Sequence, residues 1–140
     1  MRGDIFKVGA QALVNPVNCV GVAGRGLALE FKMRFPKSFA EYKNACKMHQ
    51  IAIGKMFTTR ENDTTWIVNF PTKKHWQENS QLDYIIAGLK DLTEVAIGFE
   101  SMAIPMLGCG LGRLDWGLVK PLIFEAFKDS SRVIKVVERE

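Results

Sequence analysis

Short apolar runs alternate with segments of helical periodicity along this chain of 140 residues, and this alternation limits the possible folds more than any other feature. An apolar run bounded by Gly, Pro or Asn is typical of a buried strand. A helix that joins two such strands covers one face of their sheet, so the sequence predicts an α/β protein with three layers, α/β/α. The predicted strands are Asp4–Phe6, Ala12–Val17, Lys55–Thr59, Trp66–Phe70, Met102–Met106 and Val133–Val137.

The clearest predicted helix lies between Ser80 and Gly98. Ser80 and Asp83 have the spacing of a capping box, and Gly98 is a typical helix stop. Its apolar face would be formed by Leu82, Ile85, Ile86, Leu89, Leu92 and Val95. Further helices are predicted over Gly26–Arg34, over Pro36–Met48, and from about Asp115 to Phe127. Pro121 lies beyond the first turn of the last helix, so it is expected to kink that helix or delay its start.

A chain of this length can bury a core of its own, so residues 1–140 are interpreted as a single domain. No apolar run approaches the roughly 20 residues that span a bilayer, and no apolar leader follows Met1. Cys19, Cys46 and Cys109 are widely spaced and form no CxxC pair, which favours a reducing, cytoplasmic setting without disulfides or zinc. We expect no metal, no cofactor and no membrane association.

Two glycine-rich stretches follow or precede predicted elements: GRG at residues 24–26 and GCGLG at residues 108–112. Glycine lets backbone N–H groups approach phosphate oxygens closely, although either stretch alone could be an ordinary turn. Ligands bind beyond the carboxyl ends of strands in α/β sheets, so two such loops together predict a cleft for a nucleotide diphosphate. Neither loop matches the P-loop pattern, which disfavours an NTPase.

Three polar residues could line this cleft. Asn15 and Asn18 lie at the end of the second predicted strand, where an amide can hold a turn or contact a ribose hydroxyl. An Asx turn around Pro16 is at least as good an interpretation of Asn15. Asn18 adjoins the glycine loop and is the better candidate for a ligand contact. Asp4, taken alone, is better explained as a turn carboxylate than as a ligand contact.

The stretch NFPTKKHW at residues 69–76 places lysines just past an apolar strand end. Most double lysines are a solvated pair. Here Lys73 and Lys74 are followed by His75 and Trp76, which offer a proton shuttle and a stacking plane beside two cations. Such a cluster suits a site that handles a nucleobase. The net charge of +4 also mildly favours a polyanionic partner.

Taken together, these motifs resemble the macrodomain family over nearly the whole chain. The resemblance rests on GDI at residues 3–5, LVNPVNCVGVAGRGLALEF at 13–31, FPTKKHW at 70–76 and AIPMLGCGLGRLDW at 103–116. Within the family the chain looks most like the DarG type, which removes ADP-ribose from thymidine bases of DNA, and like the related human terminal ADP-ribose glycohydrolase. The resemblance implies a single macrodomain with a mixed sheet of about six strands and helices on both faces.

The resemblance also implies roles for individual residues. Asp4 would receive the adenine amino group, Asn18 would touch the distal ribose, and Lys73 would be catalytic. The human relative has an aspartate where this chain has Gly112, which argues against a lysine–aspartate pair. The expected ADP-ribose contacts are Asp4, Ile5, Asn15, Asn18, Val22, Gly24, Arg25, Gly26, Thr72, Leu107, Gly108, Cys109, Gly110, Leu111 and Gly112. The expected catalytic set is Lys73, Asn18 and His75, and the expected nucleic-acid contacts are Lys74 and Trp76.

Glycosidic bonds are usually cleaved by two carboxylates, and the cleft motifs supply no such pair. Lys73 is therefore the predicted reactive group, provided that burial or a nearby cation lowers its pKa, with Lys74 as the expected cation. His75 would protonate the leaving base. The expected partners are ADP-ribosylated single-stranded DNA and a cognate DNA ADP-ribosyltransferase toxin, and the expected state is a monomer.

Three other functions use the same residues. A non-catalytic ADP-ribose reader would need no reactive amine. The cleft could instead hydrolyse ADP-ribose linked to protein carboxylates, or ADP-ribose 1″-phosphate. In a nucleic-acid-binding module, Lys73, Lys74 and Trp76 would only grip a strand.

Overall fold

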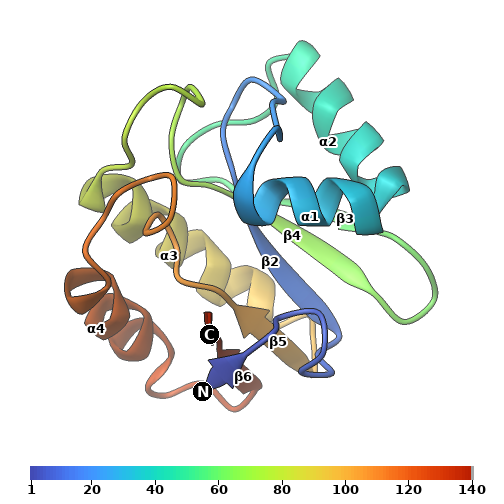
Figure 1. Cartoon of the computed structure of the whole chain (residues 1–140). Coiled ribbons are helices and arrows are strands. Elements are labelled where there is room, and N and C mark those ends of the chain that lie inside the picture. Colours follow the sequence, from blue (N-terminus) through green and yellow to red (C-terminus); the bar gives the residue numbers. More distant parts are fainter. Residues whose placement is uncertain (140) are drawn as a thin grey trace.

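The computed structural model describes residues 1–139 and has a five-stranded sheet between two layers of helices (Figure 1). The elements are β1 (Arg2–Gly3), β2 (Ala12–Val17), α1 (Gly26–Arg34), α2 (Pro36–Lys47), β3 (Phe57–Arg60), β4 (Trp66–Pro71), α3 (Leu82–Ala96), β5 (Ser101–Ile104), α4 (Trp116–Phe127), β6 (Val133–Val136) and β7 (Glu138–Arg139). The sheet order is β3-β4-β2-β5-β6, and only β3 runs antiparallel to its neighbour. The predicted three-layer fold with a mixed sheet is confirmed.

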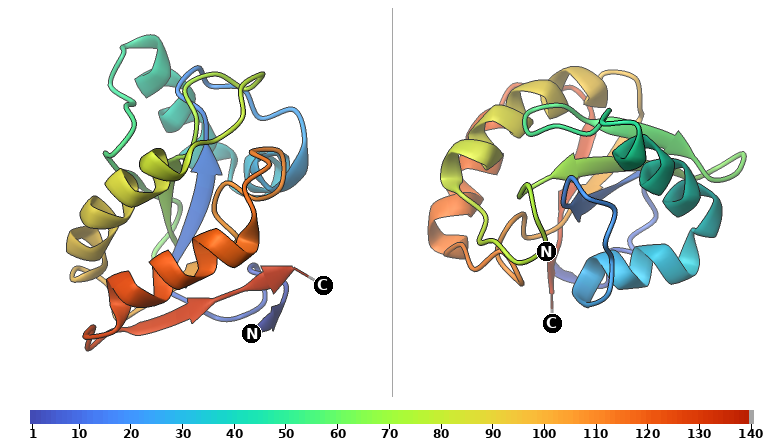
Figure 2. Two further views of the ribbon diagram at one scale, coloured as in Figure 1. Left: turned by 90° about the vertical axis from the view of Figure 1, so that its left-hand side faces the viewer. Right: turned by 90° about the horizontal axis from the view of Figure 1, so that it is seen from above.

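Alternation along the central strands assigns each side chain to one helical layer. In β2, Val14 packs in the cluster beneath α3 and α4, whereas Leu13 packs with Phe31 of α1. In β4, Val68 likewise packs in the cluster beneath α3 and α4, and Ile67 packs in the cluster that contains Phe31. Successive strand residues point to opposite faces, so a strand covered on both sides is apolar at most positions. Figure 2 shows the two pairs of helices on opposite sides of the sheet when the molecule is viewed from above.

The first predicted strand, Asp4–Phe6, is wrong. The strand there is β1, which ends at Gly3 and pairs with β7 in a separate two-stranded parallel sheet. Asp4 instead forms a turn, because its carboxylate accepts the Phe6 N–H at 2.9 Å. The central sheet therefore has five strands, and the two ends of the chain lie side by side in the second sheet.

The helix predicted between Ser80 and Gly98 exists as α3, but its predicted cap and part of its face are wrong. Gln81 is the N-cap residue and no side chain caps the helix. Ser80 is buried, and its N–H donates to Gly112 O at 2.9 Å. Ile86 is 41% exposed, and Gly88 occupies the buried face instead. Packing against the sheet, rather than local periodicity, decides which of these positions is buried.

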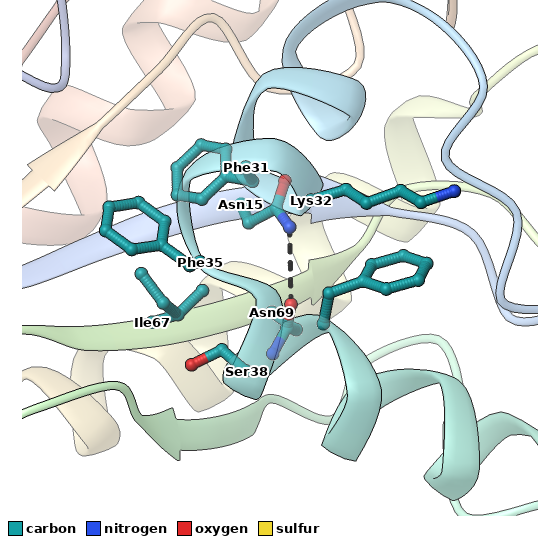
Figure 3. Close-up of a pocket in the computed structure, with 8 residues that line it drawn as sticks. Asn15, Phe31, Lys32, Phe35, Ser38, Ile67 and Asn69 are labelled. Carbon is teal, nitrogen blue, oxygen red and sulfur yellow. Dashed lines mark hydrogen bonds between the residues drawn. The ribbon is translucent and has the colours of Figure 1, made fainter.

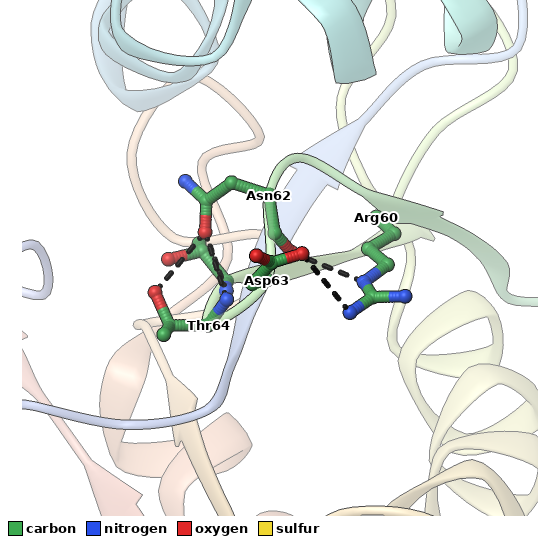
Figure 4. Close-up of polar contacts among 5 residues, drawn as sticks. Arg60, Asn62, Asp63 and Thr64 are labelled. Atoms are coloured by element: carbon green, nitrogen blue, oxygen red, sulfur yellow. Dashed lines mark hydrogen bonds and ion pairs between the residues drawn. The ribbon is translucent and has the colours of Figure 1, made fainter.

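Asp115 is the N-cap residue of α4, and its carboxylate accepts the Gly117 N–H at 2.9 Å. Pro121 lies inside α4, which begins at Trp116, so the delayed start is not observed. The turn between β3 and β4 is also held by a side chain: Asn62 Oδ1 accepts the N–H groups of Thr64 and Thr65 at 2.9 and 3.0 Å (Figure 4). A side-chain oxygen thus caps the start of α4, and another holds the turn between β3 and β4.

None of the helices within residues 1–139 combines the length and the apolar character that a membrane span requires.

Gly88 of α3 offers a test of the packing between α3 and β4. A Cβ at this position would lie 2.3 Å from Cζ of Phe70, a fully buried ring. We expect Gly88→Ala to lower the free energy of unfolding by about 1–2 kcal/mol, because overpacking outweighs the roughly 1 kcal/mol gain in helix propensity. Denaturant titration measures the difference. Gly98→Ala is the matched control, since its Cβ would make only an ordinary contact of 3.5 Å. Equal stability of the two variants would mean that the ring moves aside freely.

Candidate functional site

A cleft of about 1130 Å³ opens at the carboxyl ends of β2, β4 and β5, where the sequence predicts a ligand site. Its walls come from five parts of the chain: residues 3–6, 16–30, 72–79, 105–113 and 137–139. The strand ends are joined beyond the sheet itself, because Thr72 N donates to Val17 O at 2.8 Å and Cys19 N donates to Lys74 O at 3.1 Å. These bonds bring Asn18 and Lys73 next to each other at the base of the cleft.

Asn18 organises the loop that follows β2. Its Oδ1 accepts the N–H groups of Val20, Gly21 and Val22 at 3.1, 3.0 and 3.3 Å, and its Nδ2 donates to Val22 O at 2.8 Å. The Tyr42 hydroxyl donates to the backbone oxygen of Asn18 at 2.8 Å and lies 3.1 Å from the same Oδ1, and burial raises the pKa of Tyr42 so that it keeps its proton. Asn18 is therefore on the cleft wall, with its oxygen fully used in holding the loop.

The first glycine loop leads into α1 without a side-chain cap. Arg25 is the N-cap residue, and its side chain makes no capping hydrogen bond. Gly26 has φ of +64°, a conformation that favours glycine. Val22, Gly24, Arg25 and Gly26 all line the cleft. The uncapped N–H groups of α1 therefore adjoin the cleft, as in sites that bind phosphate.

The second glycine loop is held tightly against α3. Gly108 has φ of +72°, and its carbonyl accepts the Leu114 N–H at 2.9 Å. A Cβ on Gly112 would lie 2.5 Å from Gly108 O and 2.3 Å from Ser80 Oγ. No side chain fits at position 112 in this conformation, so an aspartate cannot stand there as a second catalytic group. The second loop approaches the first at Leu111, because a Cβ added to Gly26 would lie 3.3 Å from Cδ1 of Leu111.

Lys73 points into the cleft and is only 9% exposed. Its Nζ donates to Trp76 O at 3.1 Å. Burial lowers the pKa of Lys73, and the positive charges of Arg25 and Arg113 lower it further, against an opposing contribution from Glu78. The expectation that Lys74 supplies this cation is wrong: Lys74 Nζ lies 5.9 Å from the centre of the Tyr84 ring. An amine in this environment is more readily neutral, and therefore more nucleophilic, than a surface lysine.

The thiol in the second loop is a poorer nucleophile. Burial, together with the Asp115 carboxylate, raises the pKa of Cys109 to about 11. Cys109 therefore carries a proton at neutral pH. Of these two cleft residues, only Lys73 has a pKa that is shifted toward neutrality.

His75 and Trp76 stack on each other, with ring centres 5.8 Å apart. Trp76 lines the cleft and is 45% exposed. His75 does not line it, and its Nδ1 accepts the Gln77 N–H at 3.2 Å. The structure therefore offers no support for His75 as the acid that protonates a leaving group, but it leaves Trp76 free to stack on a ligand.

Two expected ligand contacts lie away from the cleft. Leu107 is fully buried in the core beneath α3 and α4. Asn15 lies within β2 rather than in an Asx turn, and its Nδ2 donates to Asn69 Oδ1 at 3.4 Å (Figure 3). It borders a separate cavity of about 10 Å³ beneath α1 and α2, which is far too small for a nucleotide. Alternation along β2 turns Asn15 to this side of the sheet.

Four charged residues that were not among the expected site residues also line the cleft: Glu30, Glu78, Arg113 and Arg139. Glu30 pairs with Arg139 at 3.3 Å. Arg113 directly follows the second glycine loop. This position was the one feature of the sequence that could have indicated any of the four as a cleft residue. The other expected ligand contacts, from Asp4 and Ile5 to Thr72 and the second loop, do line the cleft. Within residues 1–139, no three His, Cys, Asp or Glu side chains are grouped closely enough to hold a metal ion.

Comparison with known proteins agrees with this geometry. The chain is 46% identical over 140 residues to a DNA ADP-ribosyl glycohydrolase of Mycobacterium tuberculosis, which covers 96% of this chain and 40% of that protein. The chain thus spans about two fifths of the length of this curated relative. The solved macrodomain of Mycobacterium tuberculosis DarG superposes with a TM-score of 0.94 at 45% identity, covering 99% of this chain and 94% of that one.

A structure of Thermosipho africanus DarTG in complex with ADP-ribose superposes with a TM-score of 0.90 at 34% identity, covering 97% of this chain and 40% of that one. The family model named Macro domain matches residues 14–123, which include most of β2, both glycine loops and Lys73. The chain therefore belongs to the macro domain family.

Proposed function

We propose that this chain is a DNA ADP-ribosyl glycohydrolase that releases ADP-ribose from thymidine in single-stranded DNA. The observation that carries the proposal is Lys73, a nearly buried amine whose pKa is lowered, at the base of a nucleotide-sized cleft. A reader of ADP-ribose needs no such group. The names of the relatives, DNA ADP-ribosyl glycohydrolase and DarG, support the same activity.

In this proposal ADP-ribose lies along the cleft with its adenine near Asp4 and Ile5. Its diphosphate lies between the two glycine loops, where backbone N–H groups and the start of α1 face it. Its terminal ribose then reaches Lys73. Asn18 acts mainly by holding the loop after β2, and the second hydrogen of its amide is available to the distal ribose. The Thermosipho complex with ADP-ribose supports this choice of ligand.

The chemistry begins with neutral Lys73. Its lone pair forms a bond to C1″ as the bond from C1″ to the base breaks, and the electron pair of that bond leaves with the base. The ammonium formed on Lys73 then loses a proton, and this proton neutralises the departed nucleobase. Water next adds at C1″, the bond from Nζ to C1″ breaks, and free ADP-ribose and the amine are regenerated. Fixing the sugar against the amine supplies the near-attack geometry.

The substrate strand would cross the mouth of the cleft at Lys74 and Trp76. Trp76 is exposed there and can stack on a base. We propose that the chain acts as a monomeric cytoplasmic macrodomain and opposes a DNA ADP-ribosyltransferase, a partnership supported by its similarity to DarTG.

Lys73→Met tests the reactive amine. We expect release of ADP-ribose from an ADP-ribosylated thymidine oligonucleotide to fall at least about 100-fold, because the nucleophile is lost. Calorimetric affinity for ADP-ribose should stay within a few-fold. Lys90→Met, an exposed lysine on α3, is the control. Turnover close to wild type would remove Lys73 from the mechanism, and loss of binding as well would make it a ligand clamp. A wild-type protein that binds ADP-ribose but releases none from the oligonucleotide would be a reader.

The pH dependence of turnover tests the electrostatics around Lys73. The neutral amine reacts, so kcat should rise with pH through the pKa of Lys73, at a midpoint below the ordinary lysine value. Arg25→Met removes a nearby positive charge, which raises that pKa and moves the rising limb to higher pH. Lys74→Met should leave the midpoint in place, since Lys74 does not contribute to the shift. A midpoint that moves with Lys74 and not with Arg25 would contradict this assignment.

A further inference from the structure

Arg113 occupies a backbone conformation that is unfavourable for its residue type. Its φ is +62°, in the left-handed region that glycine adopts without cost. Within residues 1–139, the other non-glycine residue with positive φ is His49, a type that tolerates this region better. The loop thus has arginine at a position where glycine would fit the backbone best.

Two glycines of the same loop, Gly110 and Gly112, are not explained by a positive φ. Gly112 has no positive φ but is needed because a Cβ would collide with Gly108 O. Gly110 also lacks a positive φ, and a Cβ there would meet nothing within 4 Å. Glycine is therefore not used at the one position after Gly108 where the backbone favours it. Such an exception points to the side chain as the reason for the residue.

The guanidinium of Arg113 is available to a ligand. Its backbone N–H donates to Gly110 O at 3.1 Å, which holds the turn. Among residues 1–139, its side chain makes no ion pair or hydrogen bond, and it is exposed on the cleft wall. Arginine binds phosphate through several N–H donors in a planar array.

The position of Arg113 identifies which phosphate it can reach. Arg113 directly follows the second glycine loop and lines the same cleft as Lys73, whose pKa its positive charge helps to lower, so it lies near the end of the cleft where the sugar would be cleaved. At that end the remaining substrate is the nucleotide that leaves, and in an oligonucleotide this nucleotide carries phosphates of the strand. The diphosphate of ADP-ribose has the backbone N–H groups of the two loops as its partners.

We propose that Arg113 binds a backbone phosphate of the DNA strand next to the modified nucleotide, and so makes the site selective for a strand over a free nucleoside. This inference rests on the proposed function for the nature of the substrate. It adds a contact outside the ADP-ribose site. Arg113 positions the strand and takes no part in the bond changes.

Binding in a Lys73→Met background tests the contact without turnover. The ligands are ADP-ribose, ADP-ribosylated thymidine nucleoside and an ADP-ribosylated thymidine oligonucleotide, each titrated by calorimetry or fluorescence anisotropy. Arg113→Gly should weaken binding of the oligonucleotide about tenfold and leave the other two ligands within twofold. The slope of log affinity against log salt should become shallower by about 0.7, the value for one lost contact to a single strand. Arg113→Lys, which keeps the charge, should recover most of the loss.

Two further measurements keep the result interpretable. Arg113→Gly should melt at the same temperature as its parent or higher, because glycine suits the positive φ. Arg132→Gln, in the turn before β6, removes a positive charge elsewhere and should not change binding of any of the three ligands. Equal oligonucleotide binding in Arg113→Gly and its parent would overturn the proposal, and so would equal weakening for all three ligands, which would assign Arg113 to the diphosphate. Absence of turnover in the wild type would refute the proposed function and leave this binding result to be judged separately.

Discussion

The candidate site depends on the pairing of β2 with β4, which continues beyond the end of the regular strands. Six consecutive residue pairs join the two strands, and the bonds from Thr72 to Val17 and from Cys19 to Lys74 extend the pairing into the loops. Asn18 and Lys73 are far apart in the sequence, and this extension places them together. Without it, the Asn18-centred loop and the lysine would be two independent surface loops, and no common site would form.

The second loop controls the electrostatics of that site through its packing. Contact with Ser80 and Gly108 excludes a side chain at Gly112, and the loop then presents Arg113 at the cleft wall. Lys73 is therefore acted on by two positive charges, those of Arg25 and Arg113, with Glu78 as the opposing carboxylate. A lysine in such a setting loses its proton more easily than one beside an aspartate. The packing that excludes an aspartate at position 112 thus goes together with an environment that lowers the pKa of Lys73.

Burial also separates residues that the sequence makes look alike. Lys73 and Lys74 are adjacent, yet Lys73 is nearly buried and Lys74 is exposed beside Tyr84. Asn15 and Asn18 lie three residues apart, yet one faces a small cavity beneath α1 and α2 and the other holds the cleft loop. In each pair the local direction of the backbone decides which side chain faces the cleft.

The sequence by itself determined the layers of the fold, the order of most elements and the glycine loops, because apolar periodicity and glycine positions are local properties. It also placed Lys73 beyond a strand end, and there the cleft lies. The tertiary structure alone decided the short first strand, the exposure of Ile86, the cleft-facing Arg113 and the exclusion of Asn15 and Leu107. Each of these depends on contacts between residues distant in sequence: β1 with β7, α3 with β4, and the second loop with Ser80. The periodicity of one segment does not predict which distant segment will pack against it.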